Sequence, residues 1–188
     1  LFTQNARLVQ RDLSCAIELK RRLKYNNQRK RGISKARKAG VEIRFGHFYS
    51  QFYVLLADVL KQHGATPVHS LAEIEMLSGR FPNNIMLLGA FQGRALVAGT
   101  WVFRLGRSLH TQYLANSEDG RALGGLDMLI DYLIKSAIDE SDYISFGKST
   151  EQNGRILNEG LIRQKEGFGA RGIALDWYEI DLVGGIHD

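Results

Sequence analysis

The sequence is poor in the features that mark secreted and membrane proteins. It has one cysteine, Cys15, among 188 residues, so no disulfide can form within the chain and nothing in it requires an oxidising compartment. No apolar run approaches the ~20 residues of a membrane-spanning helix. The N-terminal residues 1–11 lack the charged start and apolar stretch of a signal peptide. We therefore expect a cytoplasmic protein with no membrane span.

Acidic residues are scarce near the N-terminus. Residues 1–40 hold twelve Lys and Arg against two acids, Asp12 and Glu18, whereas the whole chain has 25 bases and 20 acids. The stretch that begins at Lys20 and ends at Lys38 contains ten bases and no acid. Such a block is typical of a segment that contacts a phosphate-rich partner, such as tRNA, a nucleotide or a lipid headgroup. A solvated helix or arm whose bases face water is the alternative.

Apolar periodicity and turn residues predict the order of elements. Ser14 and Gly40 would cap a first helix over 14–39. From residue 41 the order reads β-α-α-β-β-β-α-β-α-β, a meander followed by a βαβ unit, which indicates an α/β (α+β) protein with a mixed central sheet and helices on both faces. The expected strands are 41–45, 85–91, 95–104, 109–115, 143–146 and 173–182, and the later helices are 47–63, 70–81, 121–137 and one after Asn153 and Gly154.

The predicted domain organisation is simple. Residues 1–40 would form a basic helical arm, or a linker from an upstream domain, and residues 41–183 a single α/β domain. Residues 184–188 would be a frayed tail. Because the chain begins with Leu1 and not with Met, we expect a fragment of a longer protein or a processed one.

Local motifs follow this order of elements. They are RLKYN at 22–26, SKARKAGV at 34–41, GRALVAGT at 93–100, FGKSTE at 146–151, LNEGL at 157–161 and QKEGFG at 164–169. In this order they resemble the FemAB-like branch of the GNAT (acyl-CoA N-acyltransferase) superfamily, which is related to the bacterial peptidoglycan-bridge aminoacyltransferases. The resemblance spans roughly residues 20–182, and it implies the GNAT fold preceded by the basic arm.

The resemblance also implies a reaction. FemAB-like enzymes pass an acyl or aminoacyl group from a donor, acyl-CoA or aminoacyl-tRNA, to an amine acceptor, for which a cell-wall precursor is one candidate. They usually hold two GNAT units in tandem, so an upstream GNAT domain or a homodimer is expected here. The stretch from Lys20 to Lys38 would then contact tRNA. The alternative is a non-catalytic GNAT domain that binds RNA or a partner domain through its basic arm.

The predicted catalytic residues are those suited to attack by an amine, which needs a proton acceptor and a held donor. His110 could accept the amine proton, or could simply face a neighbouring helix. Tyr113 would point to the opposite sheet face unless a bulge intervenes, and also fits the core. Glu151 follows the C-terminal end of the strand 143–146, where ligands bind in open sheets. Lys165 matches a basic residue of the family near the tRNA end, or is a solvated lysine.

The predicted donor-binding residues lie near two helix starts. The loop from Arg121 to Leu126 resembles the GNAT diphosphate loop, but Leu126 replaces the usual Gly or Ala, and Glu118 and Asp119 would repel a diphosphate. Ser149 could instead cap a helix, Asn158 could make a buried polar contact, and no spacing of His and Cys predicts a metal. The predicted donor-binding residues are Arg121, Gly124, Gly125, Lys148, Ser149, Asn158 and Phe168.

Overall fold

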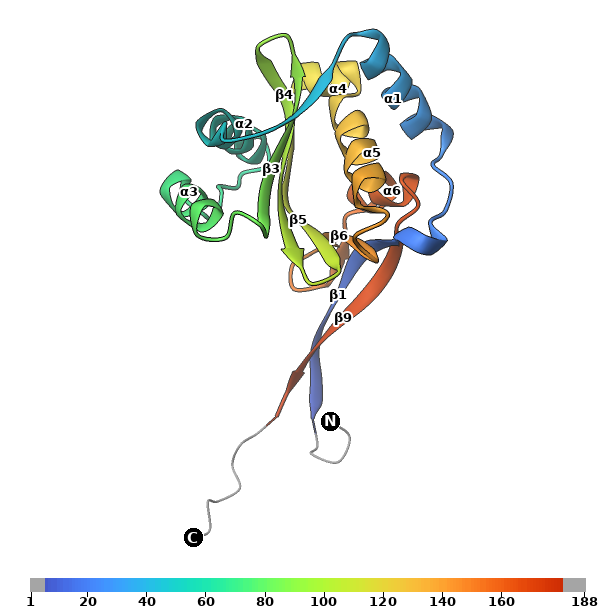
Figure 1. Cartoon of the computed structure of the whole chain (residues 1–188). Coiled ribbons are helices and arrows are strands. Elements are labelled where there is room, and N and C mark those ends of the chain that lie inside the picture. The colour runs from blue at the N-terminus through green and yellow to red at the C-terminus, as the bar shows by residue number, and fades with distance from the viewer. Residues whose placement is uncertain (1–5, 181–188) are drawn as a thin grey trace.

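The computed structural model describes residues 6–180, and a seven-stranded mixed sheet forms its centre (Figure 1). The strand order is β2-β3-β4-β5-β6-β1-β9. The pair β5–β6 is parallel, and the other neighbouring pairs are antiparallel. The strands are β1 (Arg7–Glu18), β2 (Glu42–Phe45), β3 (Ile85–Gln92), β4 (Ala95–Leu105), β5 (Ser108–Asn116), β6 (Tyr143–Lys148) and β9 (Arg171–Glu179), and a separate hairpin joins β7 (Thr150–Glu151) to β8 (Ile156–Leu157).

Helices cover both faces of this sheet, which confirms the predicted fold class. In Figure 1, α2 and α3 lie on one side of β3, β4 and β5, and α1, α5 and α6 lie on the other side. Each side has its own buried apolar cluster. None of the helices within residues 6–180 is long and apolar enough to cross a membrane. The helices are η2 (Leu19–Arg21), α1 (Asn27–Lys38), α2 (Tyr49–Lys61), α3 (Leu71–Arg80), α4 (Glu118–Leu123), α5 (Gly125–Ala137) and α6 (Glu159–Gly167).

The prediction of one helix over 14–39 is wrong in its first half. Strand β1 occupies residues 7–18, between β6 and β9, and Cys15, Ile17 and Leu19 alternate into the core. That period of two was hidden because Ala16 and Leu19 also fit a helical spacing. Helix α1 begins later, where the side chain of Asn26 accepts a hydrogen bond from the Arg29 N–H.

Two other helix boundaries differ from the prediction. The helix expected directly after Asn153 and Gly154 starts only at residue 159, because positive φ angles at residues 152–154 build the β7–β8 turn. The helix expected over 121–137 is broken into α4 and α5 at Gly124, whose φ is +79°. At that position an L side chain would be strained and would also meet the backbone of Gly32.

The basic N-terminal segment is thus part strand and part helix. Whether a domain boundary falls at residue 40 stays a prediction, although β1 is paired within the sheet on both sides. The tail at 184–188 lies outside the described residues, as do the last residues of the strand expected over 173–182. Strands β1 and β9 continue away from the body as a two-stranded ribbon (Figure 1).

Candidate active site

The parallel strands β5 and β6 are paired over a short length only. Their register runs from Ser108 opposite Tyr143 to His110 opposite Ser145. Beyond this point β5 continues beside β4 to Asn116, whereas β6 continues beside β1. The two strands therefore separate, and they leave a gap with a different hollow on each face of the sheet.

A hollow of about 800 Å³ lies on one face of the sheet, between His110 of β5 and the strands β1, β6 and β9. We call it the His110 hollow. It combines polar groups from the strands with an apolar wall from β9. Its lining residues are Asp12, Ser14, Ala16, Ser108, His110, Thr111, Gln112, Tyr143, Ser145, Phe146, Gly147, Lys148, Ile173, Leu175 and Trp177. A volume of this size is typical of sites for small molecules or for the end of a longer chain.

The imidazole of His110 is held by a short polar network. Its Nδ1 lies 3.2 Å from the Oγ of Ser145, which also accepts a hydrogen bond of 3.3 Å from the Gly147 N–H. Burial lowers the pKa of His110 below its ordinary value of 6.5, and the charge of Lys165 lowers it further. The ring is therefore neutral at pH 7. If Nδ1–H donates to Ser145, Nε2 is left as a proton acceptor.

Lys165 is buried beneath the loop that follows β6, with 4% of its surface exposed. Its Nζ donates to the carbonyl oxygens of Gly147 at 3.0 Å and Lys148 at 2.8 Å, and to the Oγ of Ser149 at 2.9 Å. Burial lowers its pKa to about 8. Because all three hydrogens of its ammonium group have partners, Lys165 holds residues 147–149 in place beside His110. The alternative of a solvated lysine is excluded by this burial.

The opposite face carries a groove between α1 and α6, which we call the α1–α6 groove. It consists of two hollows of about 620 and 580 Å³ that share Gln28, Arg29, Gly160 and Gln164. Its other lining residues are Asn26, Gly32, Lys35, Val59, Leu114, Asn116, Arg121, Ala122, Gly124, Leu126, Asp127, Leu161, Arg163, Glu166, Gly167 and Arg171. Basic side chains outnumber the two carboxylates, so the groove favours an anionic ligand.

Helix α1 covers the N-terminus of α5, where the diphosphate loop was predicted. A Cβ on Gly32 would lie 1.8 Å from the Oδ2 of Asp127, and one on Gly124 would lie 2.3 Å from the Gly32 carbonyl oxygen. Asp127, in the first turn of α5, pairs with Arg29 at 2.5 Å, and both side chains are 12% exposed. Burial raises the pKa of Asp127, and Arg29 opposes that effect. A carboxylate and the backbone of α1 thus lie against the N-terminus of α5.

The other predicted catalytic residues lie apart from His110. The phenol of Tyr113 contacts the loop before α3, accepting hydrogen bonds from the N–H groups of Val68 and His69, and its ring stacks on Trp101. Its place in the core of the α2–α3 face follows from a bulge in β5 opposite Trp101 and Val102. Glu151 is exposed and accepts a hydrogen bond of 2.7 Å from Asn158. Neither residue lines the His110 hollow.

The predicted donor-binding residues are divided among several places. Arg121 and Gly124 line the α1–α6 groove, whereas Gly125 is buried against Val97. Asn158 is the N-cap of α6 and not a mid-helix residue, since its Oδ1 accepts from the Leu161 N–H.

Three further predicted residues lie close to Lys165 and the core. Ser149 caps no helix, because it is buried between Lys165 and Cys15. Phe168 is 1% exposed and packs against Tyr25 and other core residues. Lys148 lines the His110 hollow, with its Nζ 3.9 Å from Asp12.

Sequence reasoning missed three residues of the site. Ser145 and Gly147 complete the network around His110, and Gly147 has a φ of +68° with its would-be Cβ 3.5 Å from the His110 ring. Asp12 is buried in the wall of the hollow and accepts hydrogen bonds from Gln10, Thr150 and Trp177. The hydrogen bond from Thr150 holds the pKa of Asp12 below its ordinary range. No local signal marked Asp12, because the strand that holds it, β1, was not predicted.

Comparison with known proteins identifies the fold. No protein-family model and no curated protein matches the sequence. FemX matches in structure with a TM-score of 0.69 and 9% identity, over 92% of this chain and 63% of FemX. The C-terminal domain of a proposed lysylphosphatidylglycerol synthetase from Agrobacterium fabrum matches with a TM-score of 0.67 and 11% identity, over 95% and 63%. A GCN5-related N-acetyltransferase from Kribbella flavida matches with a TM-score of 0.50 and 12% identity, over 96% and 62%.

These likenesses show a GNAT-like fold, as the sequence motifs predicted. The chain spans less than two thirds of the length of each of these three structures. Among residues 6–180, no group of three or more His, Cys, Asp and Glu side chains is arranged to hold a metal ion.

Proposed function

We propose that this domain carries the transfer site of a FemAB-like N-acyltransferase, in which an amine attacks an activated carbonyl at the gap between β5 and β6. The single observation that carries the proposal is His110, a neutral imidazole at the edge of that gap with Ser145 fixing one of its nitrogens. The likeness in fold to FemX and to the Agrobacterium fabrum domain supports the same reaction class.

In the proposed step, the acceptor amine lies in the His110 hollow and attacks the donor carbonyl carbon. A carbon–nitrogen bond forms, and the bond from that carbon to the leaving oxygen or sulfur breaks. His110 Nε2 takes the proton from the amine and returns it to the leaving group. Lys165 positions the loop at residues 147–149 next to this ring and stays outside the bond changes.

The donor is proposed to be an aminoacyl ester of tRNA in preference to acyl-CoA. The α1–α6 groove is basic and long, being formed by two adjoining hollows, which suits a polynucleotide end. A CoA diphosphate would instead need the N-terminus of α5, which Gly32 and Asp127 cover. Contact of α1 with tRNA through its exposed bases is part of this proposal.

The acceptor is proposed to be an amine attached to a larger, partly apolar molecule. Ile173, Leu175 and Trp177 give the hollow an apolar wall and are themselves 47%, 47% and 57% exposed, so they could contact more of the acceptor than its amine. A cell-wall precursor and an aminoacylated lipid are both molecules of this kind.

Replacement of His110 by Gln tests the proposal. General base catalysis contributes about 10²- to 10⁴-fold, so single-turnover transfer by the full-length protein should fall by that factor while donor binding is unchanged. Tyr113→Phe is the matched control on the same strand, since it alters an aromatic hydroxyl that lies outside the His110 hollow, against the loop before α3, and should leave transfer within about twofold of wild type. Equal rates for His110→Gln and wild type would remove His110 from the reaction.

Two observations favour a second function, RNA binding without catalysis. The covering of the N-terminus of α5 by Gly32 and Asp127, and the exposed basic face of α1, would also suit a domain that has lost acyl transfer. In that case tRNA would bind with affinity that falls steeply with salt, and no amine would be acylated by any donor. The transfer assay separates the two functions.

A further inference from the structure

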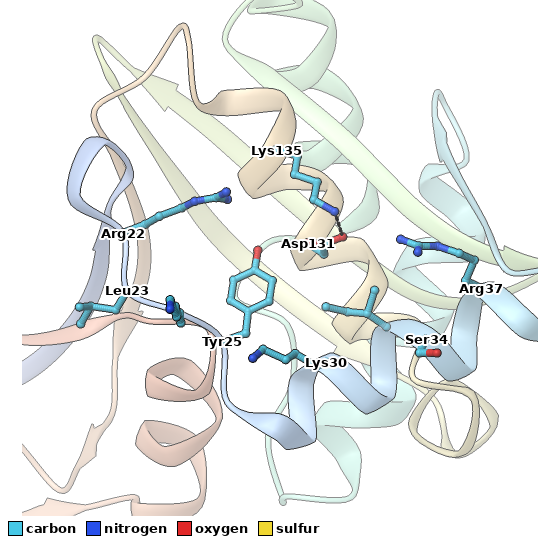
Figure 2. A pocket seen from close by; sticks show the side chains of 10 residues that line it. Arg22, Leu23, Tyr25, Lys30, Ser34, Arg37, Asp131 and Lys135 are labelled. Atoms are coloured by element: carbon cyan, nitrogen blue, oxygen red, sulfur yellow. Dashed lines mark hydrogen bonds and ion pairs between the residues drawn. The ribbon is translucent and has the colours of Figure 1, made fainter.

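A separate hollow of about 390 Å³ lies between α1 and α5, away from the gap between β5 and β6. We call it the α1–α5 pocket. Figure 2 shows the side chains of α1, α5 and the segment before α1 around it. Its lining residues are Arg22, Leu23, Lys24, Tyr25, Lys30, Ile33, Ser34, Arg37, Asp131 and Lys135.

The charge in this pocket is strongly positive. Four of its cations, Arg22, Lys24, Lys30 and Arg37, form no ion pair with any residue in the range 6–180. The one carboxylate, Asp131, already binds Lys135 at 2.7 Å and is 6% exposed. A multiply charged anion would therefore meet several cations and little repulsion.

The ring of Tyr25 forms part of the wall of the pocket. Figure 2 shows its hydroxyl pointing toward the pair formed by Asp131 and Lys135, and this oxygen is buried. Burial and the Asp131 carboxylate raise the pKa of Tyr25, so the phenol keeps its proton, which faces Asp131 and not the pocket. The cations are therefore the donors that a ligand in the pocket would meet.

The walls indicate that the ligand is more than a bare anion. Ile33 is 8% exposed, and Leu23 and the ring of Tyr25 also line the pocket. We propose that the α1–α5 pocket binds the phosphate group of a small phosphorylated ligand, with the cations on the phosphate oxygens and the apolar wall on the rest. Phosphate offers several acceptor oxygens and more than one negative charge, which is the chemistry that this set of donors recognises.

This site is separate from the proposed donor groove. Lys30, Ser34 and Arg37 line the α1–α5 pocket, whereas Arg29, Gly32 and Lys35 line the groove from another side of α1. The two sites have no lining residue in common. A ligand in the pocket would therefore leave the α1–α6 groove unoccupied.

Isothermal titration calorimetry of the full-length protein with inorganic phosphate and phenyl phosphate, at about 0.15 M salt, tests the proposal. The double variant Lys30→Gln/Arg37→Gln should weaken binding by at least about tenfold, because two charge-assisted contacts are lost. The matched control is Arg31→Gln/Lys38→Gln, which removes the same charge from exposed positions of α1 outside the pocket and should change binding by less than about threefold. Thermal unfolding of both doubles shows that α1 still folds.

Further experiments locate the bound ligand and distinguish a phosphate ester from free phosphate. Arg121→Gln, in the groove, should leave binding unchanged. Tighter binding of phenyl phosphate than of phosphate assigns the pocket to a phosphate ester, and equal binding assigns it to free phosphate. The proposal is overturned if neither probe binds, if the control double weakens binding as much as the pocket double, or if Arg121→Gln alone abolishes it.

Discussion

The burial of Lys165 makes the free energy of unfolding depend on pH in the alkaline range. In the folded protein its pKa is about 8, and in the unfolded chain it returns to about 10.5. Between these two values the unfolded state binds more protons than the folded state, so stability rises as pH rises. The gain in stability is complete above the pKa of Lys165 in the unfolded chain, about 10.5. It is lost as pH falls through the pKa of Lys165 in the folded protein, about 8.

The magnitude follows from the two pKa values. Each unit of difference corresponds to about 1.4 kcal/mol, so the full effect is about 3 kcal/mol. Between about pH 8 and about pH 9.5 the expected gain is about 1.5 kcal/mol. The comparison ends at about pH 9.5 because Tyr25 acts in the opposite direction at higher pH. Its raised pKa makes folding less favourable as pH approaches 10.0, the ordinary pKa of tyrosine.

Urea unfolding of wild type and Lys165→Met at several pH values measures this effect. The difference in free energy of unfolding between the two proteins should change by about 1.5 kcal/mol across the range, in favour of wild type at high pH. Lys61→Met, at the exposed end of α2, is the control and should show a constant difference. A constant difference for Lys165→Met as well would refute the burial of a titrating lysine.

Three further predictions follow from the geometry. Gly32→Ala should destabilise the protein by about 1–3 kcal/mol through the clash with Asp127. The matched control Gly79→Ala, with open space around its Cβ in α3, should stabilise the protein by up to about 1 kcal/mol. Thermal unfolding of the two variants and wild type measures both effects. Asn158→Ala should cost about 1 kcal/mol of stability by removing the cap of α6, and an unchanged midpoint in urea would contradict that role. The pH profile of transfer should show a rising limb below pH 6.5, where His110 loses its proton, and this limb should be absent in His110→Gln.

The sequence predicted the middle of the fold well because its signals are local. Periodic apolar residues and turn glycines mark β3, β4, β5 and α2, and Ser70 with Glu73 forms the predicted capping box of α3. The order of these elements, together with the motifs, was enough to predict the mixed sheet. His110 was proposed from the sequence because it lies on the strand that borders the gap, and its role stays a prediction.

The errors arose where distant segments decide the structure. The first strand, β1, is stabilised by β6 and β9, which lie more than 100 residues away in the chain, so no local pattern could distinguish it from a helix. The same error hid Asp12 from the list of site residues. The contact of Gly32 with the start of α5 is likewise a tertiary contact, and it cannot be predicted from the motif at residues 121–126. Lys165 was found by resemblance, but its burial depends on packing alone.

In the proposed function, the gap between β5 and β6 is a transfer site with an aminoacyl ester as its donor. The most direct measurement is single-turnover transfer of a labelled amino acid from aminoacyl-tRNA to an amine by the full-length protein, with labelled acetyl-CoA as the competing donor. We expect transfer from aminoacyl-tRNA and none from acetyl-CoA, because α1 covers the N-terminus of α5. Transfer from acetyl-CoA, or from neither donor, would contradict it.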